Sequence, residues 1–459
     1  MPHLSTDYDV RFAHARDASG LELVPDLIAR PSSVEELREI LREATAHRTY
    51  VTPAGAQSST TGASITDKGI LLSLRNLCHI GEIDTDRHTV RVGAGAIVAD
   101  VRRAAEAKGL LFTPDPTSEE ECTVGGAIAC NASGARSLRY GATGPHVQAL
   151  TVLLASGETL ELRRPQLEKN TVGYPIAHDP VEWFVGSEGT LGVVVEAEFA
   201  LHPLPHQVLG LTVPFERESD ALAFVVAARR STAVHPRCLE YFDHGAMDIA
   251  RAAEGSSSWA TGASAMVYVE ETGAHEGGDE ELPLDEWLAL AEAHHAMAED
   301  IRVYDSAASQ LEARRMRHAV PATMNERGAA RRPFGGRKVS TDWAVPYPRL
   351  AEALGIARAF ALEAGIPLGI AYGHAGNGHP HQNFVAQDAD ELTRIEQVVY
   401  ATLREVIAMG GTVAAEHGIG KLKSRWLPLQ MSEAQQRLMR AIKHEFDPHG
   451  LLAPGNVLA

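Results

Sequence analysis

The sequence is poor in cysteine and holds no closely paired cysteines. Its 459 residues include only Cys78, Cys122, Cys130 and Cys238, and no two of these form a C-x-x-C motif. A thiolate zinc site or a built-in iron–sulfur relay is therefore not indicated, because both are usually built from such pairs. So few thiols in a long chain favour a reducing compartment, and a cytoplasmic location is expected.

Long apolar runs and an excess of positive charge are also missing. No apolar stretch approaches the ~18–20 residues of a membrane span, so no transmembrane segment is expected. The start, MPHLSTDYDVRFAHARD, lacks the basic and apolar regions of a secretory signal. The net charge of −18 disfavours nucleic acid and anionic membranes as partners. These features do not decide the oligomeric state, and a homodimer is one of the alternatives.

What remains is typical of a globular protein of two or three domains, with 44% hydrophobic and 22% charged residues. Residues 28 to about 205 alternate short strands, Gly-rich turns and a few helices. One helix begins at Ser33, where Ser33 and Glu36 are expected to form a capping box. Strands at 147–155 and 159–162 predict a hairpin.

The middle of the chain has a different pattern. We expect strands at 208–215, 237–242, 265–269 and 301–304, with helices at 216–230 and 285–299. Two β-α-β units around one antiparallel sheet suggest a ferredoxin-like module. The acidic stretch Glu270–Glu286 is interpreted as a solvated loop that leads into a helix. Further expectations are a helix at 310–327, extended chain at 339–345, a helix at 348–364 and a last helix capped by Ser432.

Three Gly-rich stretches, at 53–63, 114–134 and 186–193, are the first candidates for chemistry. Small residues let a backbone approach a ligand closely, and successive N–H groups with hydroxyl side chains suit a diphosphate. The lysine of a P-loop and the spacing of a dinucleotide fingerprint are both absent.

A second candidate is the stretch GHAGNGHPH at 373–381. A strand at 368–372 leads into it and another at 383–385 follows, so three histidines lie on one turn. Together with Glu416 and His417 on another Gly-bounded turn, they indicate a zinc or manganese site with an open position.

The order of these motifs resembles a known family. PAGAQSSTTGA, TVGGAIACNASGARSLRYG, GSEGTLGVV, HAGNGHPH, AEHGIG and FDPHGLLAPGNV are similar to the FAD-linked oxidases of the vanillyl-alcohol oxidase/p-cresol methylhydroxylase superfamily. The similar branch contains D-lactate dehydrogenase, glycolate oxidase and D-2-hydroxyglutarate dehydrogenase. The resemblance implies an α+β fold: an FAD-binding p-cresol methylhydroxylase-type domain (1–205), a ferredoxin-like cap or substrate domain with the metal site (206–425), and a C-terminal segment (426–459) that returns to the FAD domain.

The resemblance also implies the cofactor residues. The first FAD segment comprises Pro53, Ala54, Gly55, Ala56, Gln57, Ser58, Ser59 and Thr60. The second comprises Pro116, Thr123, Gly125, Gly126, Asn131, Ser133, Gly134 and Tyr140. The third comprises Glu188, Gly189, Gly192, Val193 and the closing Asn456.

Some of these positions depart from the family pattern. Gln57 and Ser58 stand where Gly and Thr are usual, and in the closing N-P-G-K motif Ala453 and Asn456 replace asparagine and lysine. Covalently flavinylated relatives carry a histidine in the first loop, and none lies between Val51 and Asp67 here. Non-covalent FAD is therefore expected.

For the metal and the catalytic base, family members carry H-x-G-D-G-N-x-H and then E-H-G-I-G. The match implies that His374, His381 and Glu416 hold a zinc or manganese ion and that His417 is the base. Asn377 replaces the family aspartate, and His379 replaces an asparagine near the substrate. His379 either adds a ligand or exchanges a hydrogen-bond donor. The implied chemistry is proton removal from the substrate hydroxyl and hydride transfer to flavin N5.

The substrate anion needs cations. Arg317 matches the arginine of the family's L-W-x-x-R-E, with Arg314 in place of the tryptophan. Relatives that act on 2-hydroxyglutarate have a lysine where Ser340 stands, two residues before Asp342, and Lys338 lies further back on the same face of an extended strand. The sequence therefore predicts FAD-dependent oxidation of a D-lactate-like 2-hydroxy acid to its keto acid.

Several alternatives stay open. The substrate is D-2-hydroxyglutarate or glycolate in one alternative. Other classes are a non-redox FAD enzyme of the alkyl-dihydroxyacetone-phosphate synthase type, an NADPH-dependent enoyl reductase of UDP-sugars, and a flavin-free metal-binding remnant. The electron acceptor is equally open among a quinone, a cytochrome, an electron-transfer flavoprotein and oxygen.

Overall fold

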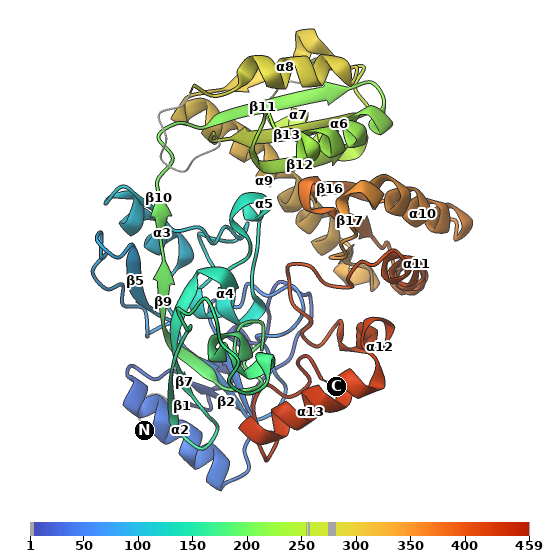
Figure 1. Cartoon of the computed structure of the whole chain (residues 1–459). Helices are drawn as coiled ribbons and strands as arrows, with labels where there is room; N and C mark the ends of the chain where they lie inside the picture. The colour runs from blue at the N-terminus through green and yellow to red at the C-terminus, as the bar shows by residue number, and fades with distance from the viewer. Residues whose placement is uncertain (1–3, 254, 256–257, 274–280, 459) are drawn as a thin grey trace. The chain divides into compact units, whose positions relative to one another are not determined.

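The computed structural model describes residues 4–253, 255, 258–273 and 281–458. Backbone contacts group the chain into two compact units, whose segments can be followed by colour in Figure 1. The first unit takes Met1–Gly134, Gly141–Leu204 and Glu416–Ala459, and the second takes Ala135–Tyr140 and Pro205–Ala415. The domain ranges 1–205, 206–425 and 426–459 stay a prediction; by backbone contact, residues 416–425 group with the first unit.

The first unit contains two larger sheets. One has the order β1-β2-β4-β3, in which β4 pairs parallel with both β2 and β3. The other is antiparallel with the order β5-β9-β7-β8, and it contains the predicted hairpin of β7 and β8. The strands are β1 (Leu4–Ser5), β2 (Leu27–Ala29), β3 (Val51–Ala54), β4 (Ile70–Ser73), β5 (Thr89–Gly93), β6 (Leu110–Leu111), β7 (Val147–Leu153), β8 (Thr159–Arg163), β9 (Val193–Ala200) and β10 (His202–Pro203).

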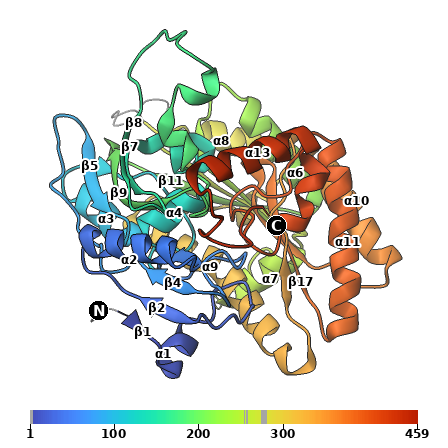
Figure 2. The ribbon, with the colours of Figure 1, turned by 90° about the horizontal axis from the view of Figure 1, so that it is seen from below.

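Helices of the first unit cover these sheets. They are α1 (Tyr8–Ala13), α2 (Val34–Ala46), α3 (Val98–Glu106), α4 (Val124–Cys130), α12 (Leu427–Gln430) and α13 (Glu433–Phe446). Figure 2 shows α2 lying along the sheet of β2 and β4. Its buried Leu37, Ile40 and Leu41 follow the spacing of one helix face and join the core formed with β2, β3 and β4.

The cap of α2 differs from the predicted capping box. The Ser33 hydroxyl accepts the N–H of Glu36 at 3.2 Å, as expected. The Glu36 carboxylate, however, accepts the backbone N–H and the hydroxyl of Ser32 instead of the Ser33 N–H. The reciprocal half of the box therefore forms one residue earlier.

The C-terminal segment returns to the first unit, as the sequence predicted. The N–H of Val51 donates to the Leu451 carbonyl at 2.9 Å, and the N–H of Ala453 donates to the Val51 carbonyl at 2.8 Å. The tail thus adds a parallel bridge to β3 at Leu452, directly before the first Gly-rich loop.

In the second unit, the described residues form one antiparallel sheet of seven strands in the order β14-β11-β13-β12-β16-β17-β15. The first four strands, with α6 and α8, have the 4-1-3-2 order of a ferredoxin-like module, which confirms that prediction. The strands are β11 (Leu209–Phe215), β12 (Pro236–Asp243), β13 (Ala265–Glu271), β14 (Arg302–Tyr304), β15 (Lys338–Ser340), β16 (Ile370–His374) and β17 (His379–Val385).

Helices of the second unit are α5 (Ser137–Tyr140), α6 (Glu218–Arg230), α7 (His244–Ala253), α8 (Leu284–Ala293), α9 (Ala307–Ala329), α10 (Leu350–Glu363) and α11 (Ala389–Ala408). The pairing register puts many polar side chains on one face of the sheet, because directly opposed residues point the same way. We call this the histidine face; its members include Lys338, Ser340, Glu240, Tyr268, Glu270, His374, His379, His381 and Asn383. Helix α9 packs against it through Met316, Val320 and Met324.

Several helices differ from the sequence prediction. Residues 124–130 were expected to belong to a Gly-rich loop but form α4, whose N-terminus is capped by the Thr123 hydroxyl. Helices α7 and α11 were not predicted. In α11, buried Ile395, Val398 and Val399 show the helical spacing that would have revealed it.

The acidic stretch at Glu270–Glu286 is not a solvated loop throughout, which corrects the sequence interpretation. Glu270 and Glu271 end β13, and both are buried. Leu284 begins α8, and residues 274–280 lie outside the described residues. The charge of Glu270 is tolerated because two arginines pair with it, as described below.

Two glycine substitutions test the packing of the second unit. Gly355 is exposed within α10 and a Cβ there meets nothing within 4 Å, so Gly355→Ala should raise the free energy of unfolding by ~0.5–1 kcal/mol. A Cβ on Gly411 would overlap the Ala344 carbonyl, so Gly411→Ala should lower it by ~1–3 kcal/mol. Urea unfolding measures both. Equal stability of the two variants would contradict the close approach of Gly411 to the Ala344 carbonyl.

Candidate active site

The hairpin of β16 and β17 carries the three predicted histidines. His374 ends β16 directly opposite His379, and His381 stands opposite Tyr372. The strands are joined by a 3₁₀ turn (Ala375–Asn377) and by Gly378, whose φ of +69° favours glycine. A Cβ on Gly378 would also overlap the Val345 carbonyl, so the turn needs a glycine for both reasons.

The hairpin brings the three imidazole rings together. Their centroids are 5.3 Å apart for His374 and His379, 5.2 Å for His374 and His381, and 4.6 Å for His379 and His381. One nitrogen of each ring lies within 4.8 Å of one nitrogen of the others, a spacing that a metal ion can bridge. All three side chains are buried.

Glu240 on β12 holds the first of these rings. Its carboxylate lies 2.5 Å from His374 Nδ1 and accepts the Nε–H of Arg317 on α9 at 2.7 Å. Burial would raise the pKa of Glu240, but Arg317 and His374 outweigh it and lower the pKa to about 2. The sequence analysis missed Glu240, since a single glutamate in a strand carries no motif.

Asp342 holds the second ring. Its Oδ1 lies 3.1 Å from His379 Nε2, and the carboxyl group is buried. The Asp342 carbonyl also accepts the N–H of Ala415 at 2.8 Å. Glu416 and His417 are the next two residues of the chain.

A second buried carboxylate lies on the histidine face. Glu270 accepts the Nε–H of Arg136 at 2.9 Å and that of Arg237 at 2.7 Å, and Tyr268 donates its hydroxyl at 2.9 Å. These arginines outweigh the effect of burial and hold the pKa of Glu270 well below its usual range. This network anchors α5 to the sheet, and no sequence signal pointed to it.

The other predicted substrate residues lie on β15 and α9. Ser340 pairs with Asn383, two residues from His381, whereas Lys338 pairs with Val385, four residues from it. The Lys338 ammonium donates to Asn325 Oδ1 at 2.5 Å, and burial lowers the pKa of Lys338 to about 8. Arg314 lies on α9 with Arg317, one turn earlier.

The first Gly-rich loop, in the first unit, exposes a row of donors. Among the described residues, the backbone N–H groups of residues 55–60 form no hydrogen bond. Gln57 occupies the left-handed region at φ +59°, and its side-chain amide donates to the carbonyls of His14 and Ser64 at 2.8 and 3.3 Å. The loop therefore keeps the backbone shape that glycine would give, with its N–H groups available to an anion.

The second FAD segment is held mainly through its backbone. Gly125 donates to the Ala94 carbonyl at 2.8 Å, and a Cβ on Gly125 would lie 2.7 Å from that of Ala94. Asn131 ends α4 at φ +49° and accepts the Gly144 N–H. Gly134 approaches Asp115 too closely for any Cβ. Tyr140 groups with the second unit.

Residues of the third predicted FAD segment contact the E-H-G-I-G turn and the first Gly-rich loop within the first unit. Glu188 accepts the N–H groups of Ile419 and Gly420 at 2.5 and 2.7 Å, so its carboxylate holds the E-H-G-I-G turn. Burial raises the pKa of Glu188, and these two N–H donors oppose the rise. Asn456 donates to the carbonyls of Ala63 and Glu188 at 2.8 and 3.3 Å.

These contacts gather the predicted motifs of the first unit. The N–H groups of Lys421 and Leu422 donate to the Thr61 carbonyl of the first loop. The Lys421 ammonium donates to Asn456 Oδ1 at 2.7 Å, and burial lowers its pKa to about 8. Gly189 lies against Pro53, where a Cβ would approach the ring to 3.1 Å. Of the remaining predicted FAD residues, Ser59 accepts the N–H groups of Thr61 and Ala63 at 3.2 and 3.3 Å through its hydroxyl, and a Cβ on Gly192 would lie 2.7 Å from Val152.

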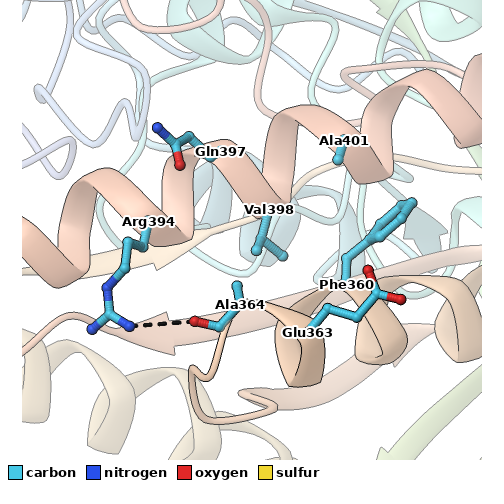
Figure 3. Close-up of a pocket in the computed structure, with 7 residues that line it drawn as sticks. All are labelled: Phe360, Glu363, Ala364, Arg394, Gln397, Val398 and Ala401. Atoms are coloured by element: carbon cyan, nitrogen blue, oxygen red, sulfur yellow. Dashed lines mark hydrogen bonds between the residues drawn. The ribbon is translucent and has the colours of Figure 1, made fainter.

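A further pocket lies elsewhere in the second unit. It has a volume of about 390 Å³ and opens between α10 and α11, as Figure 3 shows. Its lining includes Glu363 and Arg394, and the Arg394 guanidinium donates to the Ala364 carbonyl at 3.3 Å. None of the three histidines lines it, so it is separate from the candidate site.

Comparison with known proteins agrees with these motifs. Residues 204–457 match the family described as FAD linked oxidases, C-terminal domain, and residues 25–163 match an FAD binding domain. A search of the described helices finds none with the length and apolarity to cross a membrane.

Relatives that carry enzyme names cover nearly the whole chain. The chain is 30% identical to "Glycolate oxidase subunit GlcD" of Bacillus subtilis (98% of this chain, 92% of the relative). It is 29% identical to a D-lactate dehydrogenase of Anaerostipes hadrus (97% and 92%). It is 32% identical to a D-2-hydroxyglutarate dehydrogenase of Xanthomonas citri pv. viticola (94% and 89%).

Among solved structures, an alkyldihydroxyacetonephosphate synthase superposes with a TM-score of 0.74. It is 18% identical, and the alignment covers 99% of this chain and 82% of the synthase. At this identity the likeness shows a shared fold alone.

The contacts of Glu188 lead to a prediction for the turn at 416–420. Glu188→Ala leaves the buried N–H group of Gly420 and the partly buried N–H group of Ile419 without their acceptor, at a cost of ~1–3 kcal/mol. Hydrogen exchange at these two amides should therefore quicken, while Glu188→Gln retains an acceptor and partial protection. The exposed control Glu43→Ala should change neither amide. Unaltered exchange in Glu188→Ala would contradict the role of the carboxylate.

Proposed function

Since the chain belongs to the FAD-linked oxidase family, we propose that it oxidises a small D-2-hydroxy acid to the 2-keto acid with FAD as the acceptor of the hydride. The observation that carries the proposal is the buried cluster of His374, His379 and His381, beside an arginine paired with Glu240. The oxidation of a 2-hydroxy acid requires imidazoles that bind an ion and accept a proton. It also requires a nearby cation that binds the carboxylate.

The first unit fits FAD. The donors of residues 55–60 suit the diphosphate of the cofactor, and the contacts that Glu188, Thr61 and Asn456 make within the first unit support a cofactor site built from these segments. Because no histidine lies between Val51 and Asp67, we propose that FAD is bound non-covalently. When bound, FAD takes up the hydride from the substrate carbon, and a divalent ion makes the substrate hydroxyl more acidic.

The second unit fits a divalent ion. We propose His374 and His381 as ligands, since their rings converge and imidazole nitrogen is a common ligand of zinc. We propose Glu416 as the third ligand. The chain reaches it one residue after Ala415, whose N–H is bound to the Asp342 carbonyl within the second unit.

Arg317 is proposed to hold the substrate carboxylate. Its Nε is committed to Glu240, so the pairing directs the rest of the guanidinium. A guanidinium binds a carboxylate through two parallel N–H donors, which also fixes the orientation of the substrate. Its side chain is 16% exposed, so the charge is not fully screened by water.

His417 is proposed as the base that removes the hydroxyl proton. An imidazole with an ordinary pKa near ~6.5 accepts a proton at neutral pH and is the side chain most often used for this task. His417 follows the proposed ligand Glu416 directly in the chain.

A non-redox FAD enzyme is the second candidate. The specific observation in its favour is the shared fold with alkyldihydroxyacetonephosphate synthase. At full-length coverage, however, the relatives of higher sequence identity carry the names of hydroxy-acid oxidising enzymes, which favours oxidation.

Substitution of His417 tests the function and the base together. We expect the purified protein to show a flavin spectrum that bleaches when D-lactate is added without oxygen. His417→Ala should keep the spectrum and slow bleaching by ~10²–10⁴-fold, because a positioned base is lost. The exposed control His444→Ala should bleach at the rate of the unaltered protein.

The outcomes distinguish a wrong assignment of the base from a wrong assignment of the reaction. Bleaching of His417→Ala within a few-fold of the unaltered rate would assign the proton to another group. If D-lactate, glycolate and D-2-hydroxyglutarate all failed to bleach the flavin of the unaltered protein, the oxidation itself would be refuted and the non-redox candidate favoured.

The cations available on the histidine face lead to a prediction of the preferred substrate. A second carboxylate in the site must lose its hydration, which is costly without a cation beside it. Ser340 provides none, and Lys338 stands four residues, ~13 Å, further along the sheet from His381. We therefore expect a higher kcat/KM for D-lactate than for D-2-hydroxyglutarate.

Lys338→Met checks the remaining cation. Because the Lys338 ammonium is bound to Asn325 on α9, the variant should retain the preference for D-lactate. Steady-state kinetics with both acids measures this. A preference for the dicarboxylate that disappears in Lys338→Met would show that Lys338 binds the distal carboxylate.

A further inference from the structure

The β16–β17 hairpin holds one imidazole more than the proposed ligand set uses. His379 is the direct cross-strand partner of His374 and stands two residues before His381 on the same face of β17. It is 3% exposed, like His374. A buried histidine with two others beside it needs a chemical explanation, because the ring nitrogens of buried imidazoles require partners.

The ring spacings fit three ligands around one ion. With a metal–nitrogen distance of ~2.1 Å, a ring centroid lies ~3.2 Å from the metal. Two such rings are then ~5.2 Å apart at a tetrahedral angle and ~4.5 Å apart at a right angle. The observed separations of 5.3, 5.2 and 4.6 Å match these values for all three pairs.

Two of the rings are also oriented by buried carboxylates. Glu240 lies 2.5 Å from Nδ1 of His374, and Asp342 lies 3.1 Å from Nε2 of His379. A carboxylate that holds one nitrogen of an imidazole directs the other toward a metal and fixes its tautomer. His379 therefore has the same kind of support as His374, which is already a proposed ligand.

We propose that His379 is a third imidazole ligand of the divalent ion, positioned by Asp342. This inference rests on the ion of the proposed function and adds a donor to it. Three nitrogen donors from one hairpin favour zinc over manganese, since manganese prefers oxygen ligands. The asparagine of the motif that this stretch resembles would supply an amide in place of the third imidazole.

Zinc affinity tests the proposal on the full-length, FAD-loaded protein. After removal of metal, zinc is titrated against a coloured competing chelator. His379→Asn should weaken binding by more than ~100-fold, and Asp342→Asn by the ~10–100-fold typical of an orienting partner. The exposed His295→Asn makes the same chemical change elsewhere in the second unit and should leave the affinity unaltered. Zinc binding by His379→Asn within threefold of the unaltered protein would overturn the proposal.

X-ray absorption at the zinc edge gives an answer that needs no variant. The unaltered protein should show three imidazoles per zinc, and two would overturn the proposal even if His379→Asn failed to fold. If His381→Ala loses zinc while His379→Asn keeps it, only the third imidazole is refuted. If the unaltered protein binds no zinc or manganese while D-lactate still bleaches its flavin, the ion and this inference fail, but the oxidation stands.

Discussion

The buried carboxylate of Glu240 constrains the chemistry of the second unit more than any other group. It is 1% exposed, and a lone buried charge of this kind costs several kcal/mol. Burial raises the pKa of this carboxyl group and its two partners lower it, so the buried charge depends on those partners. Those partners are Arg317 on α9 and His374 on β16, and one carboxylate thus fixes the groups proposed for the substrate and for the ion.

The same arrangement recurs further along the sheet. Glu270 on β13 is the cross-strand neighbour of Cys238, which lies two residues before Glu240 on β12. Glu270 pairs with Arg136 and Arg237. Buried ion pairs of this kind add little to stability compared with apolar packing. Their contribution is to orient side chains, because each ion pair restricts the conformations of the side chains that it joins. The histidine face is therefore better explained as a support for orientation than as a stabilising core.

The sequence predicted local features well and non-local partners poorly. The first Gly-rich loop and the histidine hairpin depend on residues close together in the chain, whereas the second Gly-rich stretch was expected to be a loop and contains α4. The ferredoxin-like order of strands followed from the alternation of strands and helices along the chain. Glu240 lies 134 residues from His374, and nothing in its own segment marks it as a partner. Glu270 was misinterpreted because its neighbours are acidic, and composition alone does not reveal the arginines that pair with it. Helix α11 is a different case, since its apolar spacing was readable.

Departures from the motifs fall into two kinds with different consequences. Gln57 and Ala453 occupy positive φ angles of 59° and 46°, a conformation in which glycine or asparagine is favoured. In Gln57 the side-chain amide binds three carbonyls, which offsets the strain. Such substitutions concern the backbone conformation alone and give no reason to expect an altered function.

The other kind changes the donor chemistry. At Asn456 a lysine is lost from the closing motif, but the Lys421 ammonium reaches the same side chain from another segment, so a cation remains there. At His379 an amide is exchanged for an imidazole, and Asp342 is already in place to hold it. Since the imidazole lies beside the other two histidines, we expect the exchange to affect the proposed ion and the substrate bound to it. The histidine face is therefore where this chain differs chemically from the motif it resembles.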